Sequence, residues 1–325
     1  MPNLRWAAVY LISTLLFSST AFAQERFPSK PVQIVIPAAP ATTSDVLARM
    51  LSDHLAKRFG QQVIVQNRPG AGGTIAAASV AKAPADGYTL FMVNSQHSLN
   101  PLFYDNLPFD TLHDFAGVLQ FGDAPSVVFV HPNLGANNLA EFIALAKKQP
   151  GKITYGSAGI GTTTHLAGAY LAYRAGIDLL HIPYKGPEVR VDILAGRINM
   201  VIAPVPYLVG PAKEGKVLAL GVTTRSPLRD PAPLDVPTVE HAALLNDFDY
   251  TTYYGFVVAA QTPRPIIEQL AREIRATVEE PKITAWLTGQ AIYPRFRPLS
   301  EFDAYVKSEM QRMAPVVKAT GARRN

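Results

Sequence analysis

The fold of this chain is decided first by residues 32–60, which read VQIVIPAAPATTSDVLARMLSDHLAKRFG. The β-branched run at 32–36 predicts a strand. From Val46 onward the apolar residues recur at intervals of three and four, which predicts an amphipathic helix, and Gly60 is a typical helix stop. This stretch is therefore one β-α unit.

The same alternation continues through the rest of the chain. Further strands are predicted at 63–65, 88–93, 127–130, 153–155, 179–182, 198–202, 217–222 and 250–258. Helical patterns separate most of them, including one capped at Asn138, one opened by Pro265 and a last one capped at Ser300. Strands alternating with helices predict an α/β fold with mainly parallel sheets flanked by helices.

The length favours two lobes, because 325 residues exceed what one hydrophobic core usually needs. We expect residues 24–122 and 248–325 to form lobe 1 and residues 123–247 to form lobe 2. The proline-rich segment 225–237 marks one crossing between them. The mostly helical C-terminal part is expected to return to lobe 1, so that a cleft separates the lobes.

The first 23 residues predict the compartment. Arg5 precedes an apolar run from Trp6 to Phe17, and Ala21-Phe22-Ala23 is a small-x-small cleavage pattern, as in a secretory signal peptide. Cleavage near Ala23 would place the mature protein in the periplasm, and an uncleaved membrane anchor is the alternative. The absence of Cys excludes disulfides, zinc-thiolate sites and cysteine nucleophiles.

The charge distribution argues against nucleic-acid binding. Thirty Lys and Arg against 25 Asp and Glu give a net charge of +5, but the basic residues are interspersed with acids, as on a solvated surface. No nucleic-acid partner is therefore expected.

Four strand-to-helix junctions are unusually small and polar: residues 37–45, 67–74, 94–98 and 156–164. Helix N-termini leave N–H groups free, and small residues allow a ligand to approach the backbone, so each junction could bind a carboxylate or phosphate. A helix cap with a tight turn is the alternative at any one of them. The candidate ligand-binding residues here are Ala41, Thr42, Thr43, Ser44, Ser95, Gln96, His97, Ser157, Gly159, Gly161, Thr162 and Thr163.

Known enzyme motifs fit poorly. Residues 70–74 lack the Lys of a phosphate loop, and Tyr155 occupies the position where a nucleophile elbow needs Gly. The seven His are isolated, so neither a metal site nor a catalytic triad is predicted, and no cofactor is implied. A secreted serine-type hydrolase using Ser157 or a His is the alternative function, and a scaffold role is a third.

Several motifs together resemble the Bug family, the extracytoplasmic receptors of tripartite tricarboxylate transporters. They are FPSKPVQIVIP at 27–37, NRPGAGG at 67–73, DGYTL at 86–90, PGKITYGS at 150–157, HLAG at 165–168, HIPYKG at 181–186 and DVPT at 235–238. The resemblance runs from about Phe27 to the C-terminus. One departure is Pro40-Ala41-Thr42, where the family typically has Pro-Gly-Gly, and it adds a hydroxyl.

The resemblance implies a monomeric, two-lobed periplasmic binding protein that captures a small organic acid by hinge closure and delivers it to membrane permease subunits. It implies that the ligand contacts the first-strand loop and the Ser157 loop, together with Ala203 and Pro204, the place where family members that bind amino acids carry an acid.

The chemistry of the solute follows from the absence of acids. Residues 38–44, 67–74, 94–100, 157–164 and 203–207 contain no Asp or Glu to bind an ammonium group. The aromatic residues that could instead enclose an apolar body and donate hydrogen bonds are His97, Tyr184, Tyr207, Tyr253 and Tyr254. We therefore expect a mono- or dicarboxylate with an aromatic or aliphatic skeleton.

Overall fold

The structure is a computed structural model, and it describes residues 27–40, 42–184, 188–229 and 233–320. The signal peptide expected at 1–23 lies outside these ranges. No helix among the described residues has both the length and the apolar character needed to cross a membrane.

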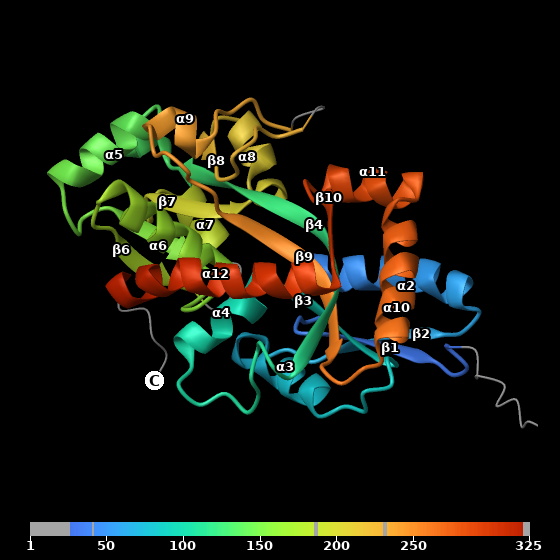
Figure 1. Cartoon of the computed structure of the whole chain (residues 1–325). Helices are drawn as coiled ribbons and strands as arrows, with labels where there is room; N and C mark the ends of the chain where they lie inside the picture. Colours follow the sequence, from blue (N-terminus) through green and yellow to red (C-terminus); the bar gives the residue numbers. More distant parts are fainter. Residues whose placement is uncertain (1–26, 41, 185–187, 230–232, 321–325) are drawn as a thin grey trace, which may run out of the picture.

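Ten strands in the described ranges form one continuous hydrogen-bonded sheet, in the order β2-β1-β3-β9-β4-β7-β5-β6, with β10 and β8 also pairing with β4 (Figure 1). The strands are β1 (Val32–Ile36), β2 (Val63–Asn67), β3 (Thr89–Asn94), β4 (Phe115–Val130), β5 (Thr154–Ser157), β6 (Leu180–Pro183), β7 (Met200–Pro204), β8 (Leu218–Val222), β9 (Thr251–Ala259) and β10 (Tyr293–Pro298). The helices are α2 (Thr43–Phe59), α3 (Thr74–Ala81), α4 (Ser95–Phe103), α5 (Leu139–Lys148), α6 (Thr163–Ala175), α7 (Glu188–Leu194), α8 (Val209–Lys213), α9 (Val239–Ala243), α10 (Arg264–Val278), α11 (Pro281–Gly289) and α12 (Leu299–Thr320), with short 3-10 turns η1 (Ala71–Gly73), η2 (Pro132–Leu134) and η3 (Val205–Tyr207).

The first β-α unit is confirmed. Thr42 caps α2 by accepting a hydrogen bond from the Asp45 amide at 3.4 Å. Gly60 ends the helix with φ of 64°, a left-handed conformation that suits glycine, and its N–H donates to the Ala56 carbonyl.

The expectation of mainly parallel sheets is correct for the outer strands and wrong for the centre. Strands β2, β1 and β3 are parallel to one another, as are β6, β5 and β7. In the centre, β4 pairs antiparallel with β9, β10, β7 and β8. The reason is that β4 carries the chain from one half of the sheet to the other while β9 brings it back, so the two run in opposite directions.

The half of the sheet around β1 has helices on both faces. Val32, Ile34 and Ile36 alternate toward a core formed with α2, α10 and α11, whereas Val35 joins the core formed with α3 and the start of α12. This alternation follows from the two-residue period of a strand.

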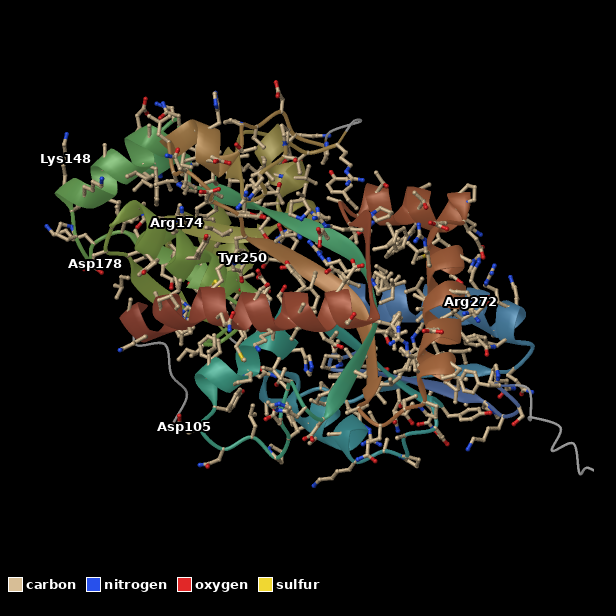
Figure 2. All side chains as sticks on the ribbon, viewed as in Figure 1. Asp105, Lys148, Arg174, Asp178, Tyr250 and Arg272 are labelled. Atoms are coloured by element: carbon tan, nitrogen blue, oxygen red, sulfur yellow. The ribbon has the colours of Figure 1, made fainter. Side chains whose placement is uncertain are left out.

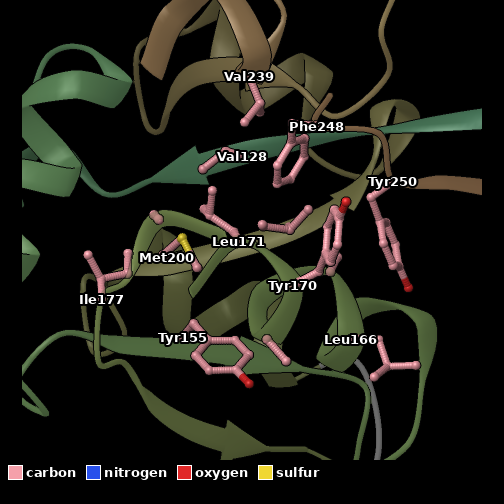
Figure 3. Packing of buried hydrophobic residues seen from close by; sticks show 14 of the residues in the cluster. Val128, Tyr155, Leu166, Tyr170, Leu171, Ile177, Met200, Val239, Phe248 and Tyr250 are labelled. Carbon is pink, nitrogen blue, oxygen red and sulfur yellow. The ribbon is translucent and has the colours of Figure 1, made fainter. Parts of the chain in front are cut away.

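The half around β5 is arranged in the same way. Val128 and Val130 of β4 face α5, α6 and α9, and Val127 and Phe129 face α7, η3 and α8. Figure 3 shows the first of these cores, in which Tyr170 of α6 packs against Phe248. Each half therefore has its own pair of cores.

The C-terminal helix α12 serves both halves. Its Phe302 and Val306 pack in the core with α3. Its Met313, Val316 and Val317, however, join the core with α6. The helix consequently lies across the crossing strands in Figure 1.

Three elements have no clear signal in the sequence. The first part of β4 carries Gly117 and Gly122, which weaken a strand pattern. Helix α4 contains Pro101, and β10 contains prolines at both its second and last positions. These elements form because their neighbours pair with them or pack on them, not because of local preference.

Candidate functional site

A cavity of about 310 Å³, here called the polar cavity, lies between the ends of β1 and β3 and the start of α6. Its lining combines glycines with hydroxyl and amide side chains and, among the described residues, includes no Asp, Glu, Lys or Arg. The lining residues are Pro37, Gly70, Gly72, Gly73, Phe91, Val93, Asn94, Gln96, His97, Asn100, Ala158, Thr162, Thr163 and Thr164.

Hydrogen-bond donors converge on the polar cavity because helices begin there. Thr162 caps α6, and the N–H groups of Thr163 and Thr164 in its first turn form no hydrogen bond with the described residues. At the start of α4, the Gln96 side-chain amide donates to Asn100 at 3.1 Å. Free amides at the positive end of a helix dipole are suited to an anion.

The glycine turn before α3 allows the backbone to reach this cavity. Gly70, Gly72 and Gly73 all have positive φ, of 121°, 63° and 89°. A Cβ atom on Gly72 would lie 3.0 Å from the Tyr104 hydroxyl. The turn thus needs glycine both for its conformation and for its closeness to α4.

A second cavity of about 320 Å³, here called the apolar cavity, lies at the carboxyl ends of β5 and β7. Its lining is mostly hydrocarbon and, within the part of the chain that the structure describes, also lacks Asp, Glu, Lys and Arg. It is lined by Gly156, Ser157, Ala158, Thr164, Val189, Val201, Ile202, Ala203, Pro204 and Tyr207. Ala158 and Thr164 line both cavities, so the two are adjacent.

The structure brings seven of the predicted site residues to these cavities. Gln96, His97, Thr162 and Thr163 line the polar cavity. Ser157, Ala203 and Pro204 line the apolar cavity. Gly159 and Gly161 lie in the loop between Ser157 and Thr162 but line neither cavity, and Ala41 lies outside the described residues.

Several hydrogen-bond donors of the loop after β5 bond to other groups of the loop or to the first turn of α6, so they are not available to a ligand. The Gly159 amide donates to the Ser157 hydroxyl at 3.1 Å, and the Gly161 amide donates to His165 Nδ1 at 3.0 Å. The Thr162 hydroxyl donates to the Gly159 carbonyl at 2.7 Å. These groups therefore stabilise the loop conformation. The free donors are the amides of the next two residues, Thr163 and Thr164.

Ser157 and His181 form the serine-histidine contact that a hydrolase would use, at 2.7 Å between Oγ and Nε2. His165 stacks on His181 with ring centroids 4.0 Å apart. Burial lowers the pKa of His181 to about 4 and that of His165 to about 3, the latter also through its neighbour His181. Both imidazoles are consequently neutral at pH 7. Ser157 itself is only 1% exposed.

Other predicted site residues have structural roles in this conformation. The Ser95 hydroxyl accepts a hydrogen bond from the Tyr253 amide at 3.0 Å, and the Tyr253 ring is fully buried against Phe302. The Tyr184 hydroxyl donates to Asp192 at 2.7 Å. Thr42 caps α2 and Ser44 lies in its first turn, and neither lines a cavity; the side chain of Thr43, the first residue of α2, is outside the described part of the structure. The sequence could not distinguish these residues because burial depends on packing.

The acid nearest to the first-strand loop, Asp45, is occupied within the fold. Its carboxylate accepts hydrogen bonds from Arg49 at 3.1 Å and from the Asn67 side chain at 2.8 Å. It thereby joins α2 to the end of β2.

Some residues that line the cavities are not among the predicted site residues, although the sequence carries a signal for several of them. Gly70, Gly72 and Gly73 belong to a junction that the sequence marks as small and polar, and Asn94 to another. Val189 and Ile202 carry no local signal, because an apolar residue on a helix or strand is usually core. In the described ranges, no group of three His, Asp or Glu side chains could hold a metal ion.

A third cavity, of about 520 Å³ and here called the charged cavity, lies beside the crossing strands. Its lining includes Arg225, Arg229, Arg295, Arg297 and Arg312 together with Asp123, Asp247, Asp249 and Glu309. Many of these charges are paired, for example Arg312 with Glu309 at 2.7 Å and Arg225 with Asp247 at 3.4 Å.

Comparison with known proteins places the chain among transport receptors. A family model described as the tripartite tricarboxylate transporter family receptor matches residues 47–322. A curated protein of Pseudomonas sp. (strain P51), the "UPF0065 protein in tcbD-tcbE intergenic region", is 36% identical over 275 residues, which are 84% of this chain and 81% of that protein.

Two solved structures share the architecture. An R. palustris protein with adipate superposes with a TM-score of 0.79 and 28% identity, covering 91% of this chain and 99% of the other. The periplasmic binding protein BugD superposes with a TM-score of 0.74 and 27% identity, covering 92% of this chain and 100% of the other.

Proposed function

Because the chain belongs to the family of tripartite tricarboxylate transporter receptors, we propose that it captures a small organic carboxylate in the polar and apolar cavities. Family membership makes it a solute-binding protein of the periplasmic type and not an enzyme, which excludes the serine hydrolase alternative. The solute itself and its contacts are the subject of the proposal.

The observation that carries the proposal is the neutral, donor-rich lining of the polar cavity. A carboxylate placed at the start of α6 would accept from the N–H groups of Thr163 and Thr164 and gain from the helix dipole. The side-chain amides of Gln96 and Asn100 also line this cavity. Charge-assisted hydrogen bonds of this kind bind an anion without a buried cation.

The lining also supports selection against amino acids. An ammonium group in a closed cleft needs a carboxylate or several acceptors, and neither cavity has an Asp or Glu in its lining. Asp45 is already bonded to Arg49 and Asn67. The proposed solute is therefore a mono- or dicarboxylate with an aliphatic or aromatic skeleton and no ammonium group.

Capture is proposed to proceed by hinge closure of two lobes, residues 24–122 with 248–325 and residues 123–247. The polar cavity is lined from both parts, by Gly72 and Gln96 on one side and by Thr163 and Thr164 on the other. A ligand that contacts both sides stabilises the closed form because only that form supplies both half-sites. Delivery to membrane permease subunits, action as a monomer and secretion by cleavage near Ala23 complete the proposal.

Isothermal titration calorimetry of the mature protein tests the solute class. Adipate and benzoate are compared with aspartate and glutamate, and we expect at least one of the first pair to bind while both amino acids bind more weakly. Tighter binding of either amino acid would contradict the proposal that the lining selects against an ammonium group. Solution scattering tests closure, since the radius of gyration should fall when the bound acid saturates the protein.

A further inference from the structure

The apolar cavity adjoins the polar cavity and has mostly hydrocarbon walls. Its walls are supplied by Val189, Val201, Ile202 and Ala203, which are between 0 and 6% exposed, and by the ring of Tyr207. Any ligand whose carboxylate lies at Thr163 and Thr164 has this cavity beside it, because Ala158 and Thr164 line both spaces.

The hydroxyl groups in the apolar cavity are largely engaged. Ser157 Oγ contacts His181 Nε2 at 2.7 Å and the amide of Gly159 at 3.1 Å. Thr164 Oγ1 accepts from the Ala158 amide at 3.0 Å and lies 3.1 Å from the Thr162 hydroxyl. Only the Tyr207 hydroxyl has no hydrogen bond with the described residues.

A second carboxylate would therefore be poorly solvated in this cavity. A buried carboxylate needs several donors or a cation, and among the described lining residues only the Tyr207 hydroxyl remains as a donor once the Thr164 amide binds the first carboxylate. The Arg190 guanidinium lies 6.0 Å from the centre of the Tyr207 ring, but Arg190 is exposed and is not part of the lining.

The cavity is closely packed along β5 and large enough for a hydrocarbon body. A Cβ atom on Gly156 would come within 2.5 Å of Ile198 and 2.7 Å of Val189, so the β5 wall is closely packed. A closed cavity of roughly 150 Å³ accommodates benzene, and the apolar cavity measures about 320 Å³.

We infer that the apolar cavity is the subsite for an uncharged hydrocarbon end, so that the preferred solute is a monocarboxylate with an aliphatic chain or a single aromatic ring. This inference rests on the proposed function, since it takes the carboxylate to lie in the polar cavity. It assigns the two cavities to the two ends of one amphipathic ligand.

A calorimetric series on the unmodified mature protein tests the inference. Acetate, butyrate and hexanoate are compared by competition, and hexanoate is then compared with adipate, and benzoate with terephthalate. We expect the dissociation constant to fall about fourfold per added methylene until the cavity is filled. The diacids should bind at least tenfold more weakly than the monoacids of the same skeleton.

A pair of variants on one helix locates the effect. Val189→Thr keeps the shape of the side chain but adds a hydroxyl to the cavity wall, whereas Val191→Thr makes the same change at a position that is 58% exposed. We expect Val189→Thr to weaken hexanoate binding about fivefold or more and to leave acetate binding unchanged. Val191→Thr should change neither.

The outcomes separate the two proposals. Tighter binding of adipate than hexanoate, or an affinity that does not change with chain length, would overturn the monocarboxylate assignment while leaving the carboxylate receptor intact. Failure of every acid to bind would instead overturn the proposed function. The series on the unmodified protein decides the matter even if Val189→Thr does not fold.

Discussion

The candidate site and the charged cavity differ in the charge of the side chains that line them. Among the described residues, the polar and apolar cavities have no charged side chain in their linings, whereas the charged cavity brings together five Arg and four acids. Elsewhere, charged side chains such as Lys148 and Arg272 project from the outside of the molecule (Figure 2).

The difference teaches how charge is used here. Beside the crossing strands, ions pair with one another: the Arg312 guanidinium binds Glu309 and donates to the Asp249 carbonyl at 2.8 Å, which joins α12 to the start of β9. In the candidate site, uncharged hydrogen-bond donors would bind the anion, and no buried cation would take part. This arrangement suits a receptor that must release its ligand. Four predictions test this contrast.

The largest effect is expected on the charged side. Arg312→Met leaves the carboxylate of Glu309, a residue only 8% exposed, without its main partner, and should lower the free energy of unfolding by about 3 to 5 kcal/mol. Arg264→Met removes an exposed partner of Glu268 and should cost less than about 0.5 kcal/mol. Urea denaturation followed by circular dichroism measures both, and equal losses would contradict the prediction.

Introducing charge into the neutral site should abolish binding. Thr163→Asp places a carboxylate in the polar cavity, and repulsion between two anions about 4 Å apart costs about 4 kcal/mol near a protein surface, or about a thousandfold in affinity. The control is Thr163→Asn, which has the same size without the charge and should retain affinity within about tenfold. If the two variants bound a carboxylate equally well, the ligand would lie elsewhere.

A buried group in the polar cavity and one in the charged cavity should change the stability of the protein with pH in opposite directions. Burial lowers the pKa of His97 in the polar cavity to about 4, so its contribution to stability is present above pH 6.5 and is lost as the pH falls toward 4, by about 3 kcal/mol. Burial raises the pKa of Asp123 in the charged cavity to about 6, against the opposing effect of Arg297 and Arg295. Its contribution is present below pH 3.8 and is lost as the pH rises through 6.

Urea denaturation between pH 4 and 6.5 checks these signs. As the pH falls, the stability of His97→Gln should decline less than that of the unmodified protein, because the buried imidazole that resists protonation is gone. The stability of Asp123→Asn should decline more, because the buried carboxyl that favours protonation is gone. His241→Gln, at an exposed position, is the control and should leave the profile unchanged. Changes of the same sign in His97→Gln and Asp123→Asn would refute the contrast.

The smallest effect concerns salt. Because no charged side chain of the described residues lines either cavity of the candidate site, the affinity for a carboxylate should change by less than about twofold between low and physiological ionic strength. Calorimetry at the two salt concentrations measures this. A steep loss of affinity with salt would mean that cations outside the described lining contribute to binding.

Much of the fold could be predicted from local pattern. The strand at Val32, the helix stop at Gly60 and the cap at Asn138 follow from β-branching, glycine conformation and side-chain capping, all of which act within a few residues. The paired direction of β4 and β9 could not, because antiparallel pairing of strands more than a hundred residues apart depends on the path of the whole chain.

The candidate site divides in the same way. The sequence by itself determined that the strand-to-helix junctions are small, hydroxyl-rich and free of acids, since those are properties of residue identity. Only the tertiary structure decided that Ser95 and Tyr253 are buried, that the Gly161 amide is taken by His165, and that Val189 faces a cavity. Burial and hydrogen-bond partners belong to the packing of distant segments, and a single segment does not carry that information.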